Sequence, residues 1–490
     1  MQFMLNQTPI TLEEYAPDTT LLEFLRTEVV QRGTKEGCAS GDCGACTVVI
    51  AEPDGDQLRY RSINSCITYL GAVDGCQVIT VEGLSSESGR LHPAQQVMVD
   101  HHASQCGFCT PGFVMSLFAM MHQASKPSSQ EQIYQALGGN LCRCTGYRPI
   151  IDAAKALLAS ENSSELVDAF SEKETRHLKS LKAWQAAKEE SSFTLKGKNS
   201  AFFASPRSMH ELLTLLNEHP EARLVAGSTD LALETTQQLR TLPKLVFTGH
   251  VAEMRQIKDH SDTLEIGAAV TYSEAESTLA KAFPALTGLL HRLGSLQVRN
   301  QGTLGGNIAN ASPIGDMPPV LLALDARLRI RNIQGVTEIP INQFFTGYRQ
   351  TILTTGNVIE SIILPKLSEN SFLRIYKLSK RLDDDISAVC LALHLTLEGT
   401  RILDARLGLG GMAAIPSRAY QAEAALMGKE FIPEELHEAQ MALSEEFSPL
   451  SDVRASAQYR MKSLQNLLLR AALECQSNQS LEVMQYANFD

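Results

Sequence analysis

The most informative stretch of this sequence is KEGCASGDCGACTV, residues 35–48. It holds Cys38, Cys43 and Cys46, and Cys66 follows, so that the spacing is C-x4-C-x2-C-x19-C. The interleaved glycines allow positive φ angles, which lets several backbone N–H groups point at one small anionic core. This spacing is typical of a site for one [2Fe–2S] cluster, whereas zinc sites usually show C-x2-C pairs. We therefore predict a cluster here, with four structural cysteines or a zinc knot as the alternatives.

A second group of cysteines has the spacing C-x2-C-x32-C-x-C and consists of Cys106, Cys109, Cys142 and Cys144. Alone it is less specific, because the first two could form a redox pair and the last two could complete a zinc site. No βαβ pattern surrounds the pair, and both pairs stand at the ends of helical stretches. A helix that begins at Thr110–Pro111 would direct its positive end toward a cluster. Beside the first site, this group predicts a second [2Fe–2S] cluster.

The three remaining cysteines, Cys76, Cys390 and Cys475, are scattered singly and are expected to be ordinary thiols.

A chain of 490 residues should hold about three or four domains. Its net charge of −12 argues against binding to nucleic acid or to anionic membranes. We expect no membrane helix, because no apolar run approaches ~18 residues, and no signal peptide, because MQFMLNQTPITLEEY lacks a basic region and carries acids early. We expect a cytoplasmic protein, in which cysteines bind metals rather than form disulfides.

Periodicity divides the chain into successive regions of different character. Residues 1–84 predict short strands and one helix, from about Thr20 to Val30, that is capped by Asp18 or Thr19. Residues 85–160 predict helices, and the charged stretch 161–192 predicts a linker that is helical only around AWQAAKEE. Residues 193–367 alternate helix and strand signals, and residues 370–475 predict strands followed by helices. The fold class is therefore multidomain α+β.

Two glycine-rich loops are candidates for a pyrophosphate site. RLVAGSTDLAL (223–233) predicts a strand, a turn at Gly227–Thr229 and a helix start, and VRNQGTLGGNIANASPIGD (298–316) supplies the second loop. Backbone N–H groups in such turns can bind phosphate oxygens from two sides. Asp316 could accept a hydrogen bond from a ribityl or ribose hydroxyl, or be an exposed loop acid. GLGGMA (408–413) formally fits a dinucleotide motif, but Pro416 follows and the next helix signal starts too late, so we reject it.

Several motifs together resemble the molybdenum hydroxylases, in particular the small iron–sulfur/FAD subunits of bacterial xanthine dehydrogenases. These motifs are KEGCASGDCGACTV, QCGFCTPGF, GGNLCRCTGYRPI, VAGSTDL, GTLGGNIANASPIGD and KLSKRLDDDISAV. The resemblance covers nearly the whole chain except residues 161–192. It implies a β-grasp ferredoxin-like domain (1–84), a helical-bundle [2Fe–2S] domain (85–160), a vanillyl-alcohol-oxidase-type FAD domain (193–367) and an α+β C-terminal domain (370–475).

The same resemblance implies which residues contact the flavin. Tyr348 would lie near the isoalloxazine and nicotinamide site, and Asp384, in the acidic loop Asp383–Asp385, would bear on NAD access. Leu293 stands where several homologues place an aromatic side chain on the flavin. The implied FAD contacts are Leu224, Val225, Ala226, Gly227, Ser228, Thr229, Asp230, Leu231, Thr303, Leu304, Gly305, Gly306, Asn307, Asp316, Ile359 and Lys377.

The resemblance also implies a division of labour between two polypeptides. The family's molybdenum domain has no counterpart in this sequence, so hydroxylation of hypoxanthine or xanthine would occur on a large partner subunit with a molybdopterin cofactor, in a dimer of heterodimers. Electrons would pass to the second cluster, then to the first, then to FAD and NAD. The alternatives are the equivalent subunit of an aldehyde or N-heterocycle hydroxylase, and a non-catalytic, zinc-stabilised assembly module.

Overall fold

The computed structural model describes residues 1–86, 88–123, 126–160, 168–189, 193–382, 384–477 and 481. The chain divides into two compact units, which are described separately below. The first unit comprises Met1–Arg255, Ala269–Glu274 and Gly294–Thr303. The second comprises Gln256–Ala268, Ala275–Leu293 and Leu304–Asp490. No helix of the described residues is long and apolar enough to cross a membrane.

The first unit begins with a five-stranded sheet in the order β2-β1-β5-β3-β4. β1 and β5 are parallel, and every other neighbouring pair is antiparallel. β2 was not predicted from the sequence, because TPIT lies at an edge with mostly exposed side chains and shows no alternation. The strands are β1 Gln2–Leu5, β2 Thr8–Thr11, β3 Thr47–Asp54, β4 Gln57–Asn64 and β5 Gln77–Ile79.

The helix of this region, α1, spans Leu21–Thr27 and is shorter than predicted. Its cap is Thr20 rather than Asp18 or Thr19. The Thr20 hydroxyl oxygen accepts a hydrogen bond from the Glu23 N–H at 3.1 Å, which satisfies one of the free N–H groups of the first turn. Val30, expected at the helix end, has a φ of 57° and lies outside it.

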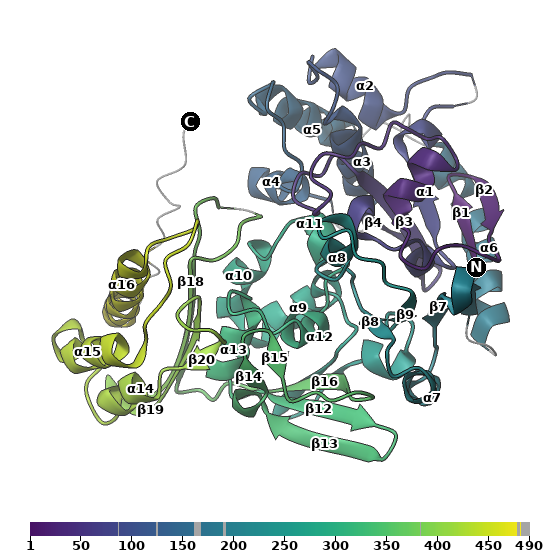
Figure 1. Cartoon of the computed structure of the whole chain (residues 1–490). Coiled ribbons are helices and arrows are strands. Elements are labelled where there is room, and N and C mark those ends of the chain that lie inside the picture. Colours follow the sequence, from purple (N-terminus) through teal and green to yellow (C-terminus); the bar gives the residue numbers. More distant parts are fainter. Residues whose placement is uncertain are drawn as a thin grey trace. The chain divides into compact units, whose positions relative to one another are not determined.

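Four helices follow and lie together in Figure 1: α2 Pro93–Asp100, α3 Thr110–Met121, α4 Gln130–Leu137 and α5 Arg148–Ser160. Every residue of α3 from Gly112 to Met121 is buried, so this helix is apolar all round and forms the centre of the group. α3 packs against α2, α4 and α5 and also against β3. The helical group and the sheet therefore share one core.

The stretch predicted as a linker contains a longer helix than expected. α6 spans Ala169–Glu189 and packs against β3 and β4. Phe170, Leu178 and Leu181 are buried in the same core as α3, and Trp184 packs against it. The sequence predicted helix only at its C-terminal end because charged side chains surround these three apolar positions. Residues 161–167 and 190–192 lie outside the described part of the chain.

The rest of the first unit is a four-stranded sheet in the order β6-β7-β9-β8, in which β9 is parallel to both β7 and β8. Its strands are β6 Phe193–Lys196, β7 Phe202–Ser205, β8 Arg223–Val225 and β9 Lys244–Phe247. Its helices are α7 Met209–Glu218, α8 Ala232–Thr236 and α11 Leu296–Arg299. β8 leads through a short turn into α8, as the first glycine-rich loop predicted.

The second unit contains a five-stranded antiparallel sheet in the order β10-β11-β16-β12-β13 and a small hairpin of β14 and β15. The strands are β10 Ile257–Asp259, β11 Thr263–Gly267, β12 Arg327–Asn332, β13 Gly335–Pro340, β14 Phe345–Gly347, β15 Gln350–Thr351 and β16 Val358–Pro365. The helices are α9 Tyr272–Ala282, whose residues up to Glu274 belong to the first unit, α10 Thr287–His291, α12 Leu304–Ala309 and α13 Met317–Ala323.

A four-stranded antiparallel sheet completes the second unit, with α14, α15 and α16 on one face and α13 on the other (Figure 1). Leu407 and Leu409 are buried on the face that α14, α15 and α16 cover. A Cβ on Gly408, between them, would lie 1.9 Å from the Pro319 carbonyl oxygen of α13, so the glycines of GLGGMA serve packing. The elements are β17 Ser371–Leu378, β18 Val389–Glu398, β19 Arg401–Gly410, β20 Ser417–Arg418, α14 Tyr420–Leu426, α15 His437–Glu446 and α16 Ala457–Ser477.

Candidate cluster and flavin sites

The first cysteine quartet converges in the structure. Cys46 and Cys66 are buried with their sulfurs 3.2 Å apart, and the Cys38 sulfur is in hydrogen-bond contact with Cys43 and Cys66. The backbone N–H groups of Ser40 and Asp42 donate to the Cys38 sulfur at 3.4 and 3.3 Å. Four sulfurs and inward-pointing N–H groups are the donor set that an anionic iron–sulfur core requires.

The pKa values of these thiols shift in opposite directions because the sulfurs share protons. Hydrogen bonds from Cys43 and Cys66 lower the pKa of Cys38, whereas the hydrogen bond to Cys38 is the largest cause that raises the pKa of Cys43 and of Cys66. All cysteines are free thiols and none forms a disulfide. The residues of this quartet therefore fit a cluster.

The second quartet also comes together. Cys106 is in hydrogen-bond contact with Cys144, and Cys109 with Cys142. Burial, followed by the contact with Cys142, raises the pKa of Cys109 to about 12. Cys109 precedes the first residue of α3, as predicted. Cys106 and Cys144 are exposed, in contrast to Cys46 and Cys66 of the first quartet.

The two cysteine loops touch each other through their backbones. The Leu141 N–H, next to Cys142, donates to the carbonyl oxygen of Cys43 at 3.0 Å. A Cβ on Gly112 of α3 would lie only 2.3 Å from the Gly44 carbonyl oxygen. The two quartets are therefore neighbours in the first unit, and the hydrogen bond from Leu141 to Cys43 joins a residue adjacent to one quartet to a ligand of the other.

The turn after β8 lies against the start of the second glycine-rich loop. A Cβ on Gly227 would be 2.0 Å from the Gln301 carbonyl oxygen and 2.9 Å from the Gly302 Cα, so no side chain fits there. Ser228 has a φ of 58° and its hydroxyl donates to the Ile67 carbonyl oxygen, next to Cys66. The structure thus brings the two loops together beside the first quartet.

The residues after this turn hold the loop of the first quartet directly. The Thr236 hydroxyl donates to the Ala39 carbonyl oxygen at 2.7 Å, and the Gln237 side chain donates to the Cys38 carbonyl oxygen at 2.9 Å. Tyr69 places its hydroxyl 3.0 Å from that of Thr235. The candidate flavin loop and the first quartet are therefore linked by several hydrogen bonds within one unit.

The remaining predicted flavin residues, apart from Thr303, lie in the second unit. A Cβ on Gly305, at the start of α12, would meet the Ala268 carbonyl oxygen at 2.6 Å, which explains the glycine. The Asn307 side-chain oxygen is buried and has no hydrogen-bond partner among the described residues. An unpaired buried acceptor is costly in a folded chain, and a bound hydroxyl or amide donor would satisfy it. Asn307 therefore fits a ligand contact.

Two other predicted residues, Asp316 and Lys377, form a buried ion pair. The Lys377 ammonium donates to Asp316 Oδ2 at 2.7 Å and to the Arg292 carbonyl oxygen at 2.8 Å. The Ser387 hydroxyl donates to Asp316 Oδ1. Asp316 is therefore not an exposed loop acid. A ribityl hydroxyl could still donate to a carboxylate oxygen of Asp316, because each oxygen has a lone pair that Lys377 and Ser387 do not use.

Tyr348, Asp384, Leu293 and Ile359 lie in different settings. Tyr348 is 65% exposed between β14 and β15. Asp384 has a φ of 48°, and its carbonyl oxygen accepts from Arg381 at 3.0 Å, while Asp383 lies outside the described residues. Leu293 and Ile359 are buried. No contact described here joins Tyr348 or Asp384 to the Asp316–Lys377 pair.

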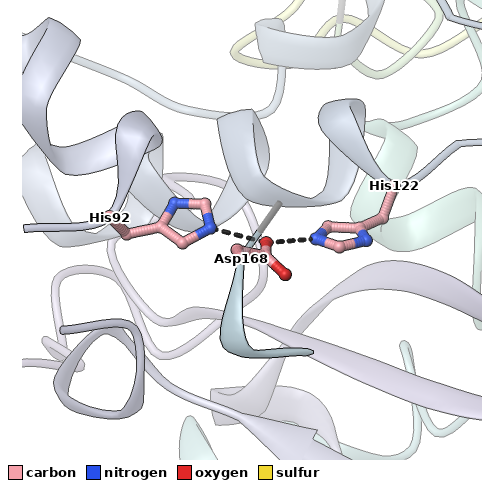
Figure 2. A group of neighbouring side chains, drawn as sticks. All are labelled: His92, His122 and Asp168. Atoms are coloured by element: carbon pink, nitrogen blue, oxygen red, sulfur yellow. Dashed lines mark hydrogen bonds and ion pairs between the residues drawn. The ribbon is translucent and has the colours of Figure 1, made fainter. Parts of the chain in front are cut away.

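One cluster of functional side chains was missed by the sequence analysis. Figure 2 shows His92 and His122 pointing at Asp168 from two sides. Their Nε2 atoms lie 2.7 and 2.8 Å from the same carboxylate oxygen, Asp168 Oδ2. The three residues are separated by tens of positions and follow no ligand spacing, so only the fold reveals them. Their three ligand atoms are close enough to suggest a metal site.

The hydrogen bonds of His92 argue against a metal ion. Its Nδ1 accepts from the Ala94 N–H at 3.1 Å, so the proton of the neutral ring is on Nε2, which donates to Asp168 and has no lone pair for a metal. Asp168 Oδ1 accepts from the N–H groups of Phe170 and Ser171 at 3.0 and 2.7 Å. The cluster is an anchor for the first turn of α6.

Replacing Asp168 by asparagine should destabilise this anchor by about 2 kcal/mol, because the amide nitrogen that takes the place of one carboxylate oxygen cannot accept a hydrogen bond from its partners. Burial opposes ionisation, yet hydrogen bonds from His122 and His92 hold the pKa of Asp168 well below its usual range. The stabilisation is therefore present above the unfolded-state pKa of about 3.9 and is lost as the pH falls through the lower folded value. The difference between D168N and wild type should narrow below about pH 4.

Urea unfolding followed by the fluorescence of Trp184, the single tryptophan, reports on α6 directly. Asp56→Asn is the matched control, because Asp56 is fully exposed and forms one surface ion pair with Lys182. Equal urea midpoints for D168N and D56N at neutral pH would contradict the anchor.

Comparison with known families covers four consecutive segments. Residues 3–71 match the 2Fe-2S iron-sulfur cluster binding domain and residues 80–155 the [2Fe-2S] binding domain. Residues 196–367 match the FAD binding domain in molybdopterin dehydrogenase, and residues 374–475 the CO dehydrogenase flavoprotein C-terminal domain. The chain belongs to the molybdenum hydroxylase family. As a molybdenum hydroxylase chain it carries two [2Fe–2S]-binding domains and one FAD-binding domain, which sets the zinc-stabilised module aside.

Individual relatives of this molybdenum hydroxylase chain support the same family assignment. It is 37% identical over 502 residues to a xanthine dehydrogenase of Emericella nidulans, covering 91% of this chain and 36% of the relative. A solved carbon monoxide dehydrogenase from Hydrogenophaga pseudoflava is 27% identical with a TM-score of 0.54, covering 57% of this chain and 98% of that one. A quinoline 2-oxidoreductase from Pseudomonas putida 86 is 28% identical with a TM-score of 0.52, covering 56% and 96%. The chain spans about a third of the length of the curated relatives it matches.

Proposed function

We propose that this chain is the electron-transfer subunit of a xanthine dehydrogenase. It would pass electrons from hypoxanthine or xanthine, hydroxylated at a molybdopterin cofactor on a large partner subunit, to NAD. The observation that carries the proposal is the unbroken series of contacts in the first unit. Leu141, beside Cys142, donates to the Cys43 carbonyl, and Ser228 of the flavin loop donates to the Ile67 carbonyl beside Cys66.

The chemistry of the bound groups fits this series: [2Fe–2S] clusters carry one electron at a time, and a flavin combines two of them into a hydride. The cysteine quartets hold the clusters, and the N–H groups of Ser40 and Asp42 stabilise negative charge at the first site. Leu224–Leu231, Thr303–Asn307, Asp316, Ile359 and Lys377 would hold FAD, with Tyr348 and Asp384 near the nicotinamide.

Exposure of the cysteines supports the direction of transfer. Cys106 and Cys144 are exposed, whereas Cys46 and Cys66 are buried next to the flavin loop. An external donor therefore reaches the second quartet first, and the first quartet lies between it and the flavin loop. The large subunit would dock beside Cys106 and Cys144, in a heterodimer that pairs into a dimer of heterodimers.

A second candidate function is the same role in a hydroxylase for an aldehyde or an N-heterocycle. The structural likeness to quinoline 2-oxidoreductase favours this alternative. The substrate pocket would lie on the partner subunit in both cases, so the same electron-transfer chain could serve either substrate. The xanthine dehydrogenase relatives, which match over most of this chain, favour purines.

Steady-state assays of the co-purified two-subunit complex distinguish the two candidate functions. With xanthine as donor and NAD as acceptor, NADH should form at a rate well above that with quinoline or benzaldehyde. Faster reduction by quinoline or benzaldehyde would assign the alternative. Turnover with xanthine that reduces oxygen but not NAD would contradict the proposed acceptor.

A further inference from the structure

Two buried carboxamides, Asn140 and Gln297, meet where three functional segments of the first unit converge. Asn140 lies two residues before Cys142 of the second quartet, and Gln297 lies on α11, shortly before the second flavin loop. Asn140 is 2% exposed and Gln297 is fully buried. Neither residue belongs to a quartet or to the flavin contacts, so the functional proposal above leaves them without a role.

Hydrogen bonds from these two amides connect all three segments. Asn140 Nδ2 donates to the Gly44 carbonyl oxygen at 3.0 Å, and Gly44 lies between Cys43 and Cys46 of the first quartet. Gln297 Nε2 donates to Asn140 Oδ1 at 3.1 Å. One pair of side chains therefore ties both cysteine loops to the segment that leads into the flavin loop.

Two hydroxyl groups complete the cluster. The Ser116 hydroxyl of α3 donates to Asn140 Oδ1 at 2.6 Å, and the Thr47 hydroxyl donates to the Gly44 carbonyl oxygen at 2.6 Å. Gln297 Nε2 lies 3.3 Å from the Thr47 oxygen. Ser116 and Thr47 are buried as well, so the whole network lies in the interior.

Glycines surround the pair and let the backbones approach closely. A Cβ on Gly44 would lie 2.3 Å from the Gly139 carbonyl oxygen, and one on Gly139 would lie 2.1 Å from the Gln297 side-chain oxygen. A side chain on Gly44 would therefore displace the loop of the second quartet, and one on Gly139 would displace Gln297 and Ser295 of the α11 segment. The amides therefore lie at a close approach of the two cysteine loops.

Stability alone does not explain these amides. Burying a carboxamide costs free energy unless all its groups are paired, and apolar side chains would fill the same volume more cheaply. The Gln297 side-chain oxygen has no hydrogen-bond partner among the described residues. The Gln77 side-chain oxygen of the same unit is buried without such a partner as well. The placement of Asn140 and Gln297 between the two cysteine loops and α11, rather than the unpaired oxygen, therefore indicates a role beyond packing.

We propose that Asn140 and Gln297 are positioning residues for electron transfer, which fix the first cluster loop against the second and against the flavin-side segment. The proposal rests on the proposed function, since it assumes that electrons cross between the quartets. Electron transfer between centres slows steeply with separation. Hydrogen bonds around a cluster also tune its reduction potential, and Asn140 orients the Gly44 peptide within the first loop.

The test uses the two-subunit complex with Asn140→Asp. This variant keeps the shape and the acceptor for Ser116 and Gln297 but loses the N–H that binds the Gly44 carbonyl. Gln77→Glu is the matched control, because Gln77 is also a fully buried carboxamide of the first unit that donates to a backbone carbonyl, that of Asn6. Ser116→Ala is a milder second variant, in case N140D does not accumulate.

Each variant is measured on protein with wild-type iron and flavin content. Dithionite titration gives the reduction potential of each cluster, and electron paramagnetic resonance gives the magnetic coupling between the reduced clusters. Rapid mixing with xanthine gives the rate of flavin reduction. N140D should shift the potential of the first cluster, change the coupling and slow flavin reduction at least tenfold. S116A should change the same quantities in the same direction but less, and Q77E should change none.

Wild-type potentials, coupling and rate in N140D and S116A, or equal changes in Q77E, would assign Asn140 a merely structural role and overturn the proposal. The dithionite titration needs no substrate. Failure of xanthine to reduce the wild-type complex would therefore reject the proposed function and leave the positioning test intact.

Discussion

Cys46→Ser should remove one of the two clusters and leave the other in place. Cys46 is buried 3.2 Å from Cys66, so no water or neighbouring side chain can readily replace its thiolate, and serine is a poor ligand for iron in such clusters. The iron content should fall from about four to about two atoms per chain. Iron and sulfide analysis, together with electron paramagnetic resonance of the reduced protein, measures this result.

Cys76→Ser is the control for that variant. Cys76 is also buried, with 6% of its surface exposed against 1% for Cys46, and it belongs to neither quartet. We expect C76S to keep about four iron atoms and both signals. Full iron content in C46S, or equal losses in C46S and C76S, would contradict the assignment of the first quartet.

Gly227→Val should abolish FAD binding while both clusters remain. The added Cβ would lie 2.0 Å from the Gln301 carbonyl oxygen and 2.9 Å from the Gly302 Cα, and both are backbone atoms that cannot rotate away. The two glycine-rich loops must therefore separate, which removes the close pair of backbones proposed to bind the pyrophosphate. The flavin-to-iron ratio of purified G227V should fall at least tenfold.

Gly288→Ala is the control for the flavin loop, because a Cβ there meets no atom within 4 Å and the residue lies in the helix α10. Alanine is favoured over glycine in a helix, so G288A should fold and bind FAD normally. A wild-type flavin-to-iron ratio in G227V would show that the β8–α8 turn does not hold the cofactor.

The parts of this protein that the sequence predicted best are those with a local signal. The four cysteines of the first quartet are recognised by their spacing, and the helix start at Thr110–Pro111 by its proline. The turn after β8 was predicted because strand, small residues and helix start follow one another within eleven residues. Each of these signals lies within one region of the chain, so that no contact between distant segments is needed to recognise it.

The parts that were missed depend on contacts between distant residues. Gln297 and Asn140 are 157 positions apart, and Asp168 lies 76 positions from His92. The helix α6 was underestimated because its stability comes from burying Phe170, Leu178 and Leu181 against another segment. Asp316 was taken as a possible exposed acid because its partner Lys377 lies 61 positions away.

Electron paramagnetic resonance of the anaerobically purified, dithionite-reduced chain tests the central claim, that eight cysteines hold two separate [2Fe–2S] clusters. The account predicts two distinguishable signals, each integrating to about one spin per chain, in brown protein with about four iron and four sulfide atoms. A single signal, or colourless protein that contains zinc and no iron, would contradict it.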